Sequence, residues 1–165
     1  MMVIYLKRGK VEEDIQQEDL KVSEIVRNTI NKIEREGDQA LKELSEKFDK
    51  WTPETFRLSK QQIEEICASI PEQTILDIEF AQNNIRNFAE EQRKSMKDIE
   101  VETMPGVILG HKNIPVNSVG CYIPGGRYPM VASAHMSVLT AKVAGVKRVI
   151  ACTPPINGEI PAATV

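Results

Sequence analysis

The chain has 165 residues, enough for one sizeable hydrophobic core or two small ones, and it is 41% hydrophobic and 27% charged, as is typical of a soluble globular protein. Only 5% of the residues are aromatic, so we expect a mainly aliphatic core. The formal net charge of -3 argues against nucleic acid as the main partner, and no apolar run approaches the ~18 residues of a membrane span.

The first segments favour helices. Residues 1–20 are interpreted as an N-terminal arm, because a short apolar run is followed by charges without clear periodicity. Ser23 is a candidate N-cap for a helix that ends at Gly37, and Asp38 is a candidate N-cap for the next one. Residues 21–116 are expected to form the mainly helical part of a first α/β domain.

Two further helices are predicted before the strands. Ser59 and Gln62 match a capping box, which predicts a helix that Pro71 ends. A long helix follows over about residues 72–96. Its inner stripe is expected to carry four residues at helical spacing: Ile78, Ala81, Ile85 and Phe88.

The periodicity then changes to that of strands. Residues 99–109 alternate and turn at Pro105 and Gly106, which predicts a hairpin or two short strands. A strand near 117–124, apolar enough to be buried on both faces, precedes a helix near 131–144 and a second buried strand near 147–155. We therefore predict a βαβ unit with parallel strands over 117–153, and residues 117–165 as the start of a truncated second, Rossmann-like domain.

The three cysteines and two histidines are scattered. Cys67, Cys121 and Cys152 lack paired spacing and have apolar neighbours, so we interpret them as buried, reduced thiols of a cytoplasmic protein. His111 and His135 have no carboxylate or cysteine partner at ligand spacing, so no metal site is predicted.

The turn after the first parallel strand, "YIPGGRYP", is the candidate binding site. Gly125 and Gly126 lack a Cβ, so an anion such as a diphosphate can approach the backbone at the start of the following helix. Arg127 can pair with an anion, and the ring of Tyr122 can stack on a base or ribose. The pattern is neither GxGxxG nor a P-loop, and Pro-Gly-Gly is also an ordinary tight turn.

Three stretches carry a family resemblance. "VGCYIPGGRYP", "AKVAGVKRVIACTPP" and the upstream "MPGVILGHKNIPV" resemble the histidinol dehydrogenase family, most closely the branch that includes sulfopropanediol dehydrogenases. Histidinol dehydrogenases proper usually carry Ser or Thr followed by Ala-Pro after the glycines. Arg127 and Tyr128 stand there in this chain.

The resemblance implies a zinc- and NAD-dependent homodimeric enzyme that oxidises a primary alcohol to a carboxylate in two hydride transfers. It implies that Tyr122 contacts NAD, with Pro124, Gly125 and Gly126 forming the adjoining loop. Arg127 is expected to bind cofactor or substrate. His135 is a candidate to face the substrate or cofactor cleft, and the alternative is a histidine that is hydrogen-bonded beside the turn. The small-molecule alcohol is either histidinol or a sulfonated diol such as 2,3-dihydroxypropane-1-sulfonate.

The family's catalytic Glu-His pair and zinc ligands lie further along its chain, so we expect no catalytic residue or zinc ligand here. The 165 residues are then the amino-terminal part of a longer enzyme, inactive alone. Two alternatives stay open: a non-catalytic truncated nucleotide-binding or assembly module, and a phosphate-binding α/β domain. Continuation of the reading frame into a zinc-ligand and Glu-His segment distinguishes the enzyme from the module.

Overall fold

The computed structural model describes residues 12–125 and 128–165. The chain divides into two compact units, residues 1–53 and 54–165. In the first unit, helix α1 (Glu12–Glu36) is followed by helix α2 (Asp38–Asp49), and Gly37 between them has a φ of 57°. The predicted start at Ser23 is wrong, because residues 12–20 of the predicted arm are already helical. The acidic sequence that begins at Glu12 explains this, since negative charge stabilises a helix N-terminus.

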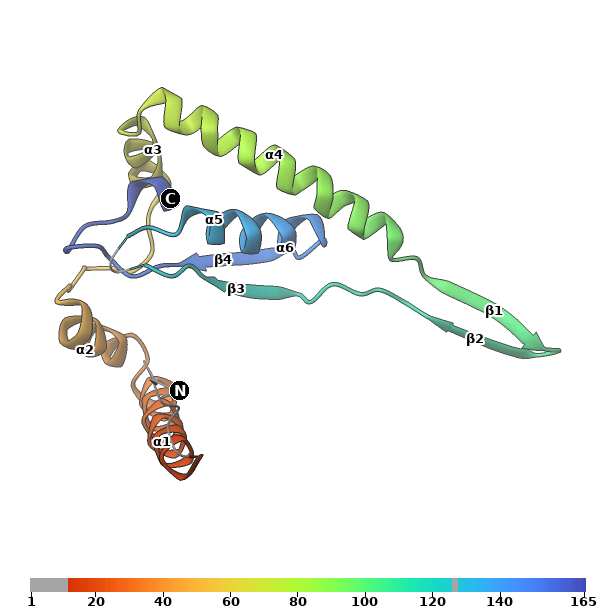
Figure 1. The fold of residues 1–165 in the computed structure, drawn as a ribbon, viewed down its shortest axis with the longest axis horizontal. Coiled ribbons are helices and arrows are strands. Elements are labelled where there is room, and N and C mark those ends of the chain that lie inside the picture. Colours follow the sequence, from red (N-terminus) through yellow and green to blue (C-terminus); the bar gives the residue numbers. More distant parts are fainter. Residues whose placement is uncertain (1–11, 126–127) are drawn as a thin grey trace, which may run out of the picture. The chain divides into compact units, whose positions relative to one another are not determined.

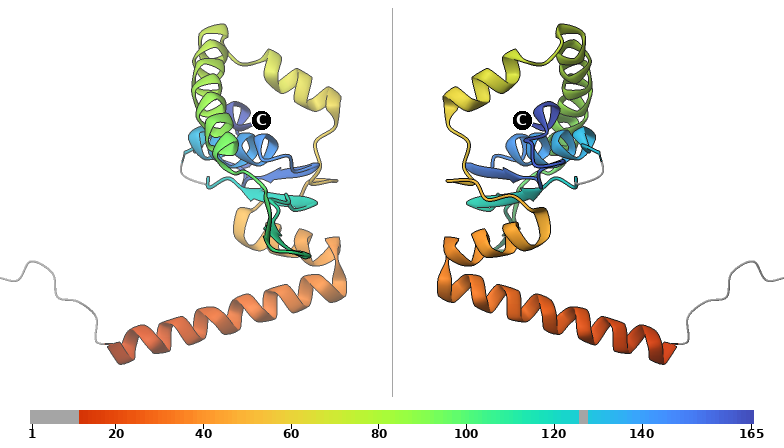
Figure 2. Two further views of the ribbon diagram at one scale, coloured as in Figure 1. Left: turned by 90° about the vertical axis from the view of Figure 1, so that its right-hand side faces the viewer. Right: turned by 90° about the vertical axis from the view of Figure 1, so that its left-hand side faces the viewer.

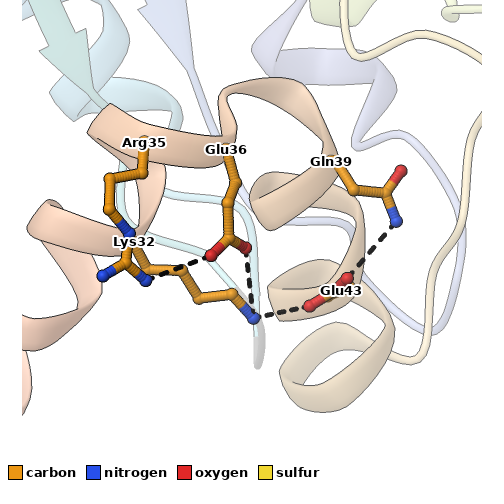
Figure 3. Close-up of polar contacts among 5 residues, drawn as sticks. All are labelled: Lys32, Arg35, Glu36, Gln39 and Glu43. Carbon is orange, nitrogen blue, oxygen red and sulfur yellow. Dashed lines mark hydrogen bonds and ion pairs between the residues drawn. The ribbon is translucent and has the colours of Figure 1, made fainter.

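Charged side chains join the two helices of the first unit (Figure 3). The Lys32 ammonium lies 2.5 Å from a Glu43 carboxylate oxygen and 3.8 Å from one of Glu36. The hydrogen bond between Lys32 and Glu43 raises the pKa of the lysine and lowers that of the glutamate. The cluster is exposed, so its contribution to stability is small.

The second unit begins with helix α3 (Lys60–Ala68) and helix α4 (Glu72–Ser95). The predicted capping box is confirmed: the Gln62 N–H donates to the Ser59 hydroxyl, and the Ser59 N–H donates to the Gln62 side chain. The buried stripe of α4 ends on Ala89 rather than Phe88, whose side chain is 67% exposed. The small alanine lets α4 pack closely on the helical segment of the βαβ unit, against Leu139 and Val143 (Figures 1 and 2).

The predicted hairpin is confirmed. Strand β1 (Ile99–Met104) pairs antiparallel with β2 (Val107–His111), and Gly106 occupies the turn with a φ of 80°. A bulge lies between Glu102 and Met104. At the hairpin base, the Asp98 carboxylate accepts hydrogen bonds from the backbone and side chain of Asn113, which lowers the pKa of Asp98.

The predicted βαβ unit is also confirmed. Strand β3 (Ser118–Tyr122) pairs in parallel with β4 (Arg148–Cys152). The connection contains helix α5 (Val131–Ala134), the π-helical segment η1 (His135–Leu139) and helix α6 (Thr140–Val143). Gly145, with a φ of 92°, follows the end of the helical segment. The chain is therefore α/β, with a helical leader and one βαβ unit of a partial Rossmann-like fold.

The parallel sheet is covered on one face only. Cys121 and Ile123 point to the buried side and are 5% and 1% exposed. Tyr122 and Ile150 are 65% and 47% exposed, so the prediction of two buried faces is wrong. Within the described residues, helices cover only the sheet face that carries Cys121. The apolar sequence of a strand does not reveal whether another element covers each of its two faces.

Two of the three cysteine interpretations are wrong, since Cys67 and Cys152 are exposed and only Cys121 is buried. Cys152 lies opposite Tyr122 on the uncovered sheet face, which explains its exposure. After β4, a tight turn over residues 156–159 leads to the 3-10 helix η2 (Ala162–Thr164). Among the described residues, no helix is both long and apolar enough to span a membrane.

Candidate functional site

The carboxyl ends of β3 and β4 lie side by side. Tyr122 and Cys152 are register partners, and the Ile123 N–H donates to the Cys152 carbonyl oxygen over 2.8 Å. This bond extends the parallel pairing one residue beyond the strands and anchors Ile123 in the core. Side chains alternate along a strand, so the Tyr122 ring lies on the uncovered face, ready to contact a ligand.

Gly125 lies against the loop that follows β4. A Cβ at this position would sit 3.2 Å from both the Thr153 hydroxyl oxygen and the Pro154 ring. The φ of Gly125 is not in the left-handed region, so its backbone does not require glycine. The structure thus adds a reason for Gly125 that the sequence did not indicate: the missing side chain lets the two strand-end loops touch.

The remaining turn leads to the helix. Gly126 and Arg127 lie outside the described residues, so their predicted roles stay predictions. Tyr128 is 66% exposed, and α5 begins at Val131 without a side-chain cap from Met130. The helix start at Val131 confirms the predicted helix near 131–144.

The sequence around the turn carries no acidic residue. Between Glu102 and Glu159 the chain has no Asp or Glu, whereas it has several basic residues. An anionic ligand at the strand ends would thus meet no repulsion from this stretch. This charge pattern and the glycine turn together favour an anion over a cation.

His135 begins the π-helical segment η1 and is 9% exposed. Burial lowers the pKa of its imidazole below the ordinary 6.5, so the ring is neutral at pH 7. A neutral imidazole can both donate and accept a hydrogen bond. π-Helical turns occur often at functional sites. The placement of His135 toward a substrate stays a prediction.

The described residues contain no group of three or more His, Cys, Asp or Glu side chains that could hold a metal ion. His111 lies at the hairpin base, where its Nε2 is 3.1 Å from the Lys97 carbonyl oxygen. A carbonyl oxygen only accepts, so this ring nitrogen donates and is not free as a metal ligand.

Thr153 and Pro154 are neighbours of the turn that the sequence interpretation missed. Both follow β4 directly. The carboxyl ends of adjacent parallel strands meet at one edge of a sheet, and ligands bind there. The carboxyl end of the predicted second strand, considered together with that of the first, would have indicated Thr153 and Pro154 as candidates.

Comparison with known proteins identifies the family. The sequence model of histidinol dehydrogenase matches residues 12–165. A histidinol dehydrogenase homolog from Shouchella clausii (strain KSM-K16) is 66% identical over 164 residues, which are 99% of this chain and 39% of that protein. The sulfopropanediol 3-dehydrogenase of Ruegeria pomeroyi (strain ATCC 700808 / DSM 15171 / DSS-3) is 46% identical over 158 residues, 96% of this chain and 36% of that protein.

A solved structure agrees with these matches. The crystal structure of histidinol dehydrogenase from Elizabethkingia anophelis superimposes with a TM-score of 0.77 at 28% identity, covering 97% of this chain and 34% of the other. The chain thus spans less than two fifths of the length of these relatives. From the match over residues 12–165 and this shared fold, we conclude that the chain belongs to the histidinol dehydrogenase family.

Proposed function

We propose that the chain is the amino-terminal part of an NAD- and zinc-dependent alcohol dehydrogenase that oxidises a primary alcohol to a carboxylate in two hydride transfers. The turn after β3 binds the NAD. One observation carries this assignment: the carboxyl ends of two parallel strands meet beside Gly125, with the exposed Tyr122 ring next to them. NAD supplies the hydride acceptor, and the chain's residues bind and orient it.

The described residues fit a dinucleotide. The Tyr122 ring offers an exposed aromatic face, and the half-buried Gly125 joins the two strand-end loops beside it. The helix that begins at Val131 directs its free N–H groups toward this end of the unit. Gly126 and Arg127 complete the loop in the proposal.

The described residues do not fit zinc, because they contain no candidate ligand cluster. The zinc ligands and the catalytic Glu-His pair are therefore assigned to the rest of the protein, and no step through zinc is assigned to this chain. His135 is proposed to face the substrate as a neutral hydrogen-bonding group. The full-length enzyme is proposed to be a cytoplasmic homodimer.

For the substrate, we favour a sulfonated diol over histidinol. Identity is 46% to the sulfopropanediol 3-dehydrogenase of Ruegeria pomeroyi and 38% to the histidinol dehydrogenase of Vibrio cholerae. Arg127, which stands where histidinol dehydrogenases proper usually have Ser or Thr, would pair with a sulfonate. Kinetics with both alcohols, side by side, decide between them.

The test of the NAD site uses the full-length enzyme and calorimetric titration with NAD. Tyr122→Ala removes the stacking face and should cost about 1 kcal/mol, which is roughly a fivefold weaker affinity. Tyr122→Phe keeps the ring and serves as the matched control. Gly126→Val places a branched side chain beside the diphosphate and should weaken NAD binding more than Tyr122→Ala does.

Both variants must melt near the wild-type temperature, since a valine in a tight turn can unfold a domain. Unchanged NAD affinity in Tyr122→Ala and in a folded Gly126→Val would refute the site. Binding of NAD without oxidation of any alcohol would instead support the non-catalytic module. Arg127→Ala should raise the KM for NAD if Arg127 binds cofactor, or the KM for the alcohol if it binds the sulfonate.

A further inference from the structure

The loop after β4 forms a second wall of the proposed NAD site. The hydroxyl oxygen of Thr153 and the ring of Pro154 occupy the space where a side chain at Gly125 would lie. The register of the strands fixes this contact, because Tyr122 and Cys152 are paired immediately before the two loops. A ligand that lies over Gly125 therefore meets Thr153 from the neighbouring strand.

The Thr153 hydroxyl is available to such a ligand. Among the described residues it has no hydrogen-bond partner, whereas the hydroxyls of Ser137 and Thr140 bond to helix carbonyls nearby in sequence. Thr153 is half-buried, and its hydroxyl is not one of the fully buried side-chain atoms without a partner in the described residues, so it reaches the surface. A hydroxyl group can donate to a phosphate oxygen, and a hydrogen bond to a charged group is stronger than one to a neutral group.

We propose that Thr153 binds the cofactor, its hydroxyl donating a hydrogen bond to a diphosphate oxygen that lies over Gly125. This inference rests on the proposed NAD site and adds a ligand-binding residue from the second strand. The Pro154 ring holds the backbone of the loop beside the turn, so Thr153 needs little reordering when NAD binds.

The test compares Thr153→Val with Thr153→Ser in the full-length enzyme. Valine keeps the branched shape that fills the space beside Gly125 and removes the hydroxyl, whereas serine keeps the hydroxyl and loses a methyl. Thr153→Val should weaken NAD binding about tenfold and raise the KM for NAD with little change in kcat. Thr153→Ser should bind NAD nearly as the wild type does.

Two ligands that contain only part of NAD test which group accepts the hydrogen bond from Thr153. ADP-ribose has the diphosphate but no nicotinamide, so its affinity should fall in Thr153→Val by the same factor as that of NAD. Adenosine has no phosphate, so its affinity should not change. An equal loss for adenosine would overturn the assignment to the diphosphate.

The outcomes separate this inference from the proposed function. If Tyr122→Ala weakens NAD binding and Thr153→Val does not, the NAD site stands and the role of Thr153 is refuted. If neither variant alters NAD binding, the proposed site itself is refuted. Equal weakening in Thr153→Val and Thr153→Ser, with lowered melting temperatures, would show that Thr153 acts through packing and would overturn the hydrogen bond.

Discussion

Gly125→Ala tests the contact between the two strand-end loops through stability. The added Cβ would lie 3.2 Å from the Thr153 hydroxyl oxygen and from Pro154 Cγ, and 3.4 Å from Pro154 Cδ. The two separations of 3.2 Å are shorter than ordinary van der Waals contacts, and the Pro154 ring cannot rotate away. Overpacking of this kind costs about 1–3 kcal/mol.

The alanine also restricts the unfolded chain, which contributes about 0.4–1 kcal/mol of stability where the backbone conformation is permitted. The midpoints of the two ranges, about 2 and about 0.7 kcal/mol, give a net loss of about 1.3 kcal/mol for Gly125→Ala. For a protein of 150–250 residues this lowers the melting temperature by roughly 3–5 °C. Scanning calorimetry or urea unfolding, followed by circular dichroism, measures the change.

Gly120→Ala is the matched control, because no atom lies within 4 Å of its added Cβ. This variant should gain about 0.5–1 kcal/mol, since glycine weakens a strand interior. A cycle with Thr153→Ala adds a second check, because removing that hydroxyl should relieve part of the cost of Gly125→Ala. A Gly125→Ala protein as stable as the wild type would show that the two loops do not touch.

Three more predictions concern other parts of the chain. Gly110→Ala places a Cβ on the Ile99 carbonyl oxygen, so amide exchange should show loss of protection across β1 and β2. Arg93→Ala removes the guanidinium donor to the Val143 carbonyl at the end of α6 and should cost about 1 kcal/mol in urea unfolding, with Arg93→Lys losing less. Burial lowers the pKa of His135 in the folded state, so the unfolded chain takes up the proton first and stability should fall as pH drops through 6.5. His135→Gln should flatten that pH dependence, and an unchanged slope would contradict the assignment.

Local signals in the sequence predicted the features that depend on few residues. The capping box at Ser59 and the hairpin turn at Gly106 rest on side-chain and backbone chemistry within four residues. The βαβ unit followed from two apolar strands around a helix rich in small residues. The contact between Gly125 and Thr153 was missed, because it depends on how two strands align rather than on either loop alone.

The errors share another physical cause. Phe88 and Ala89 are adjacent on α4, about 100° apart around the axis, and the position of the neighbouring helix selects which is buried. The apolar strands indicated two covered faces, but periodicity does not specify which element supplies each layer. Residues 12–20 of α1 have no clear apolar stripe, so the sequence did not predict that they are helical. The acidic residues at the start of α1 stabilise the helix.

The π-helical segment η1 has a consequence for chain length. His135, Leu139 and Val143 are all buried, although they are spaced four residues apart. In a regular α-helix, a residue four positions further along lies about 40° further around the helix axis. The wider π-helical turn accommodates one additional residue, so the side chains of His135, Leu139 and Val143 stay on the same side of the helix. A deletion of one residue in this turn should yield a regular helix between unshifted strands, so we expect family members of that length to lack the π turn.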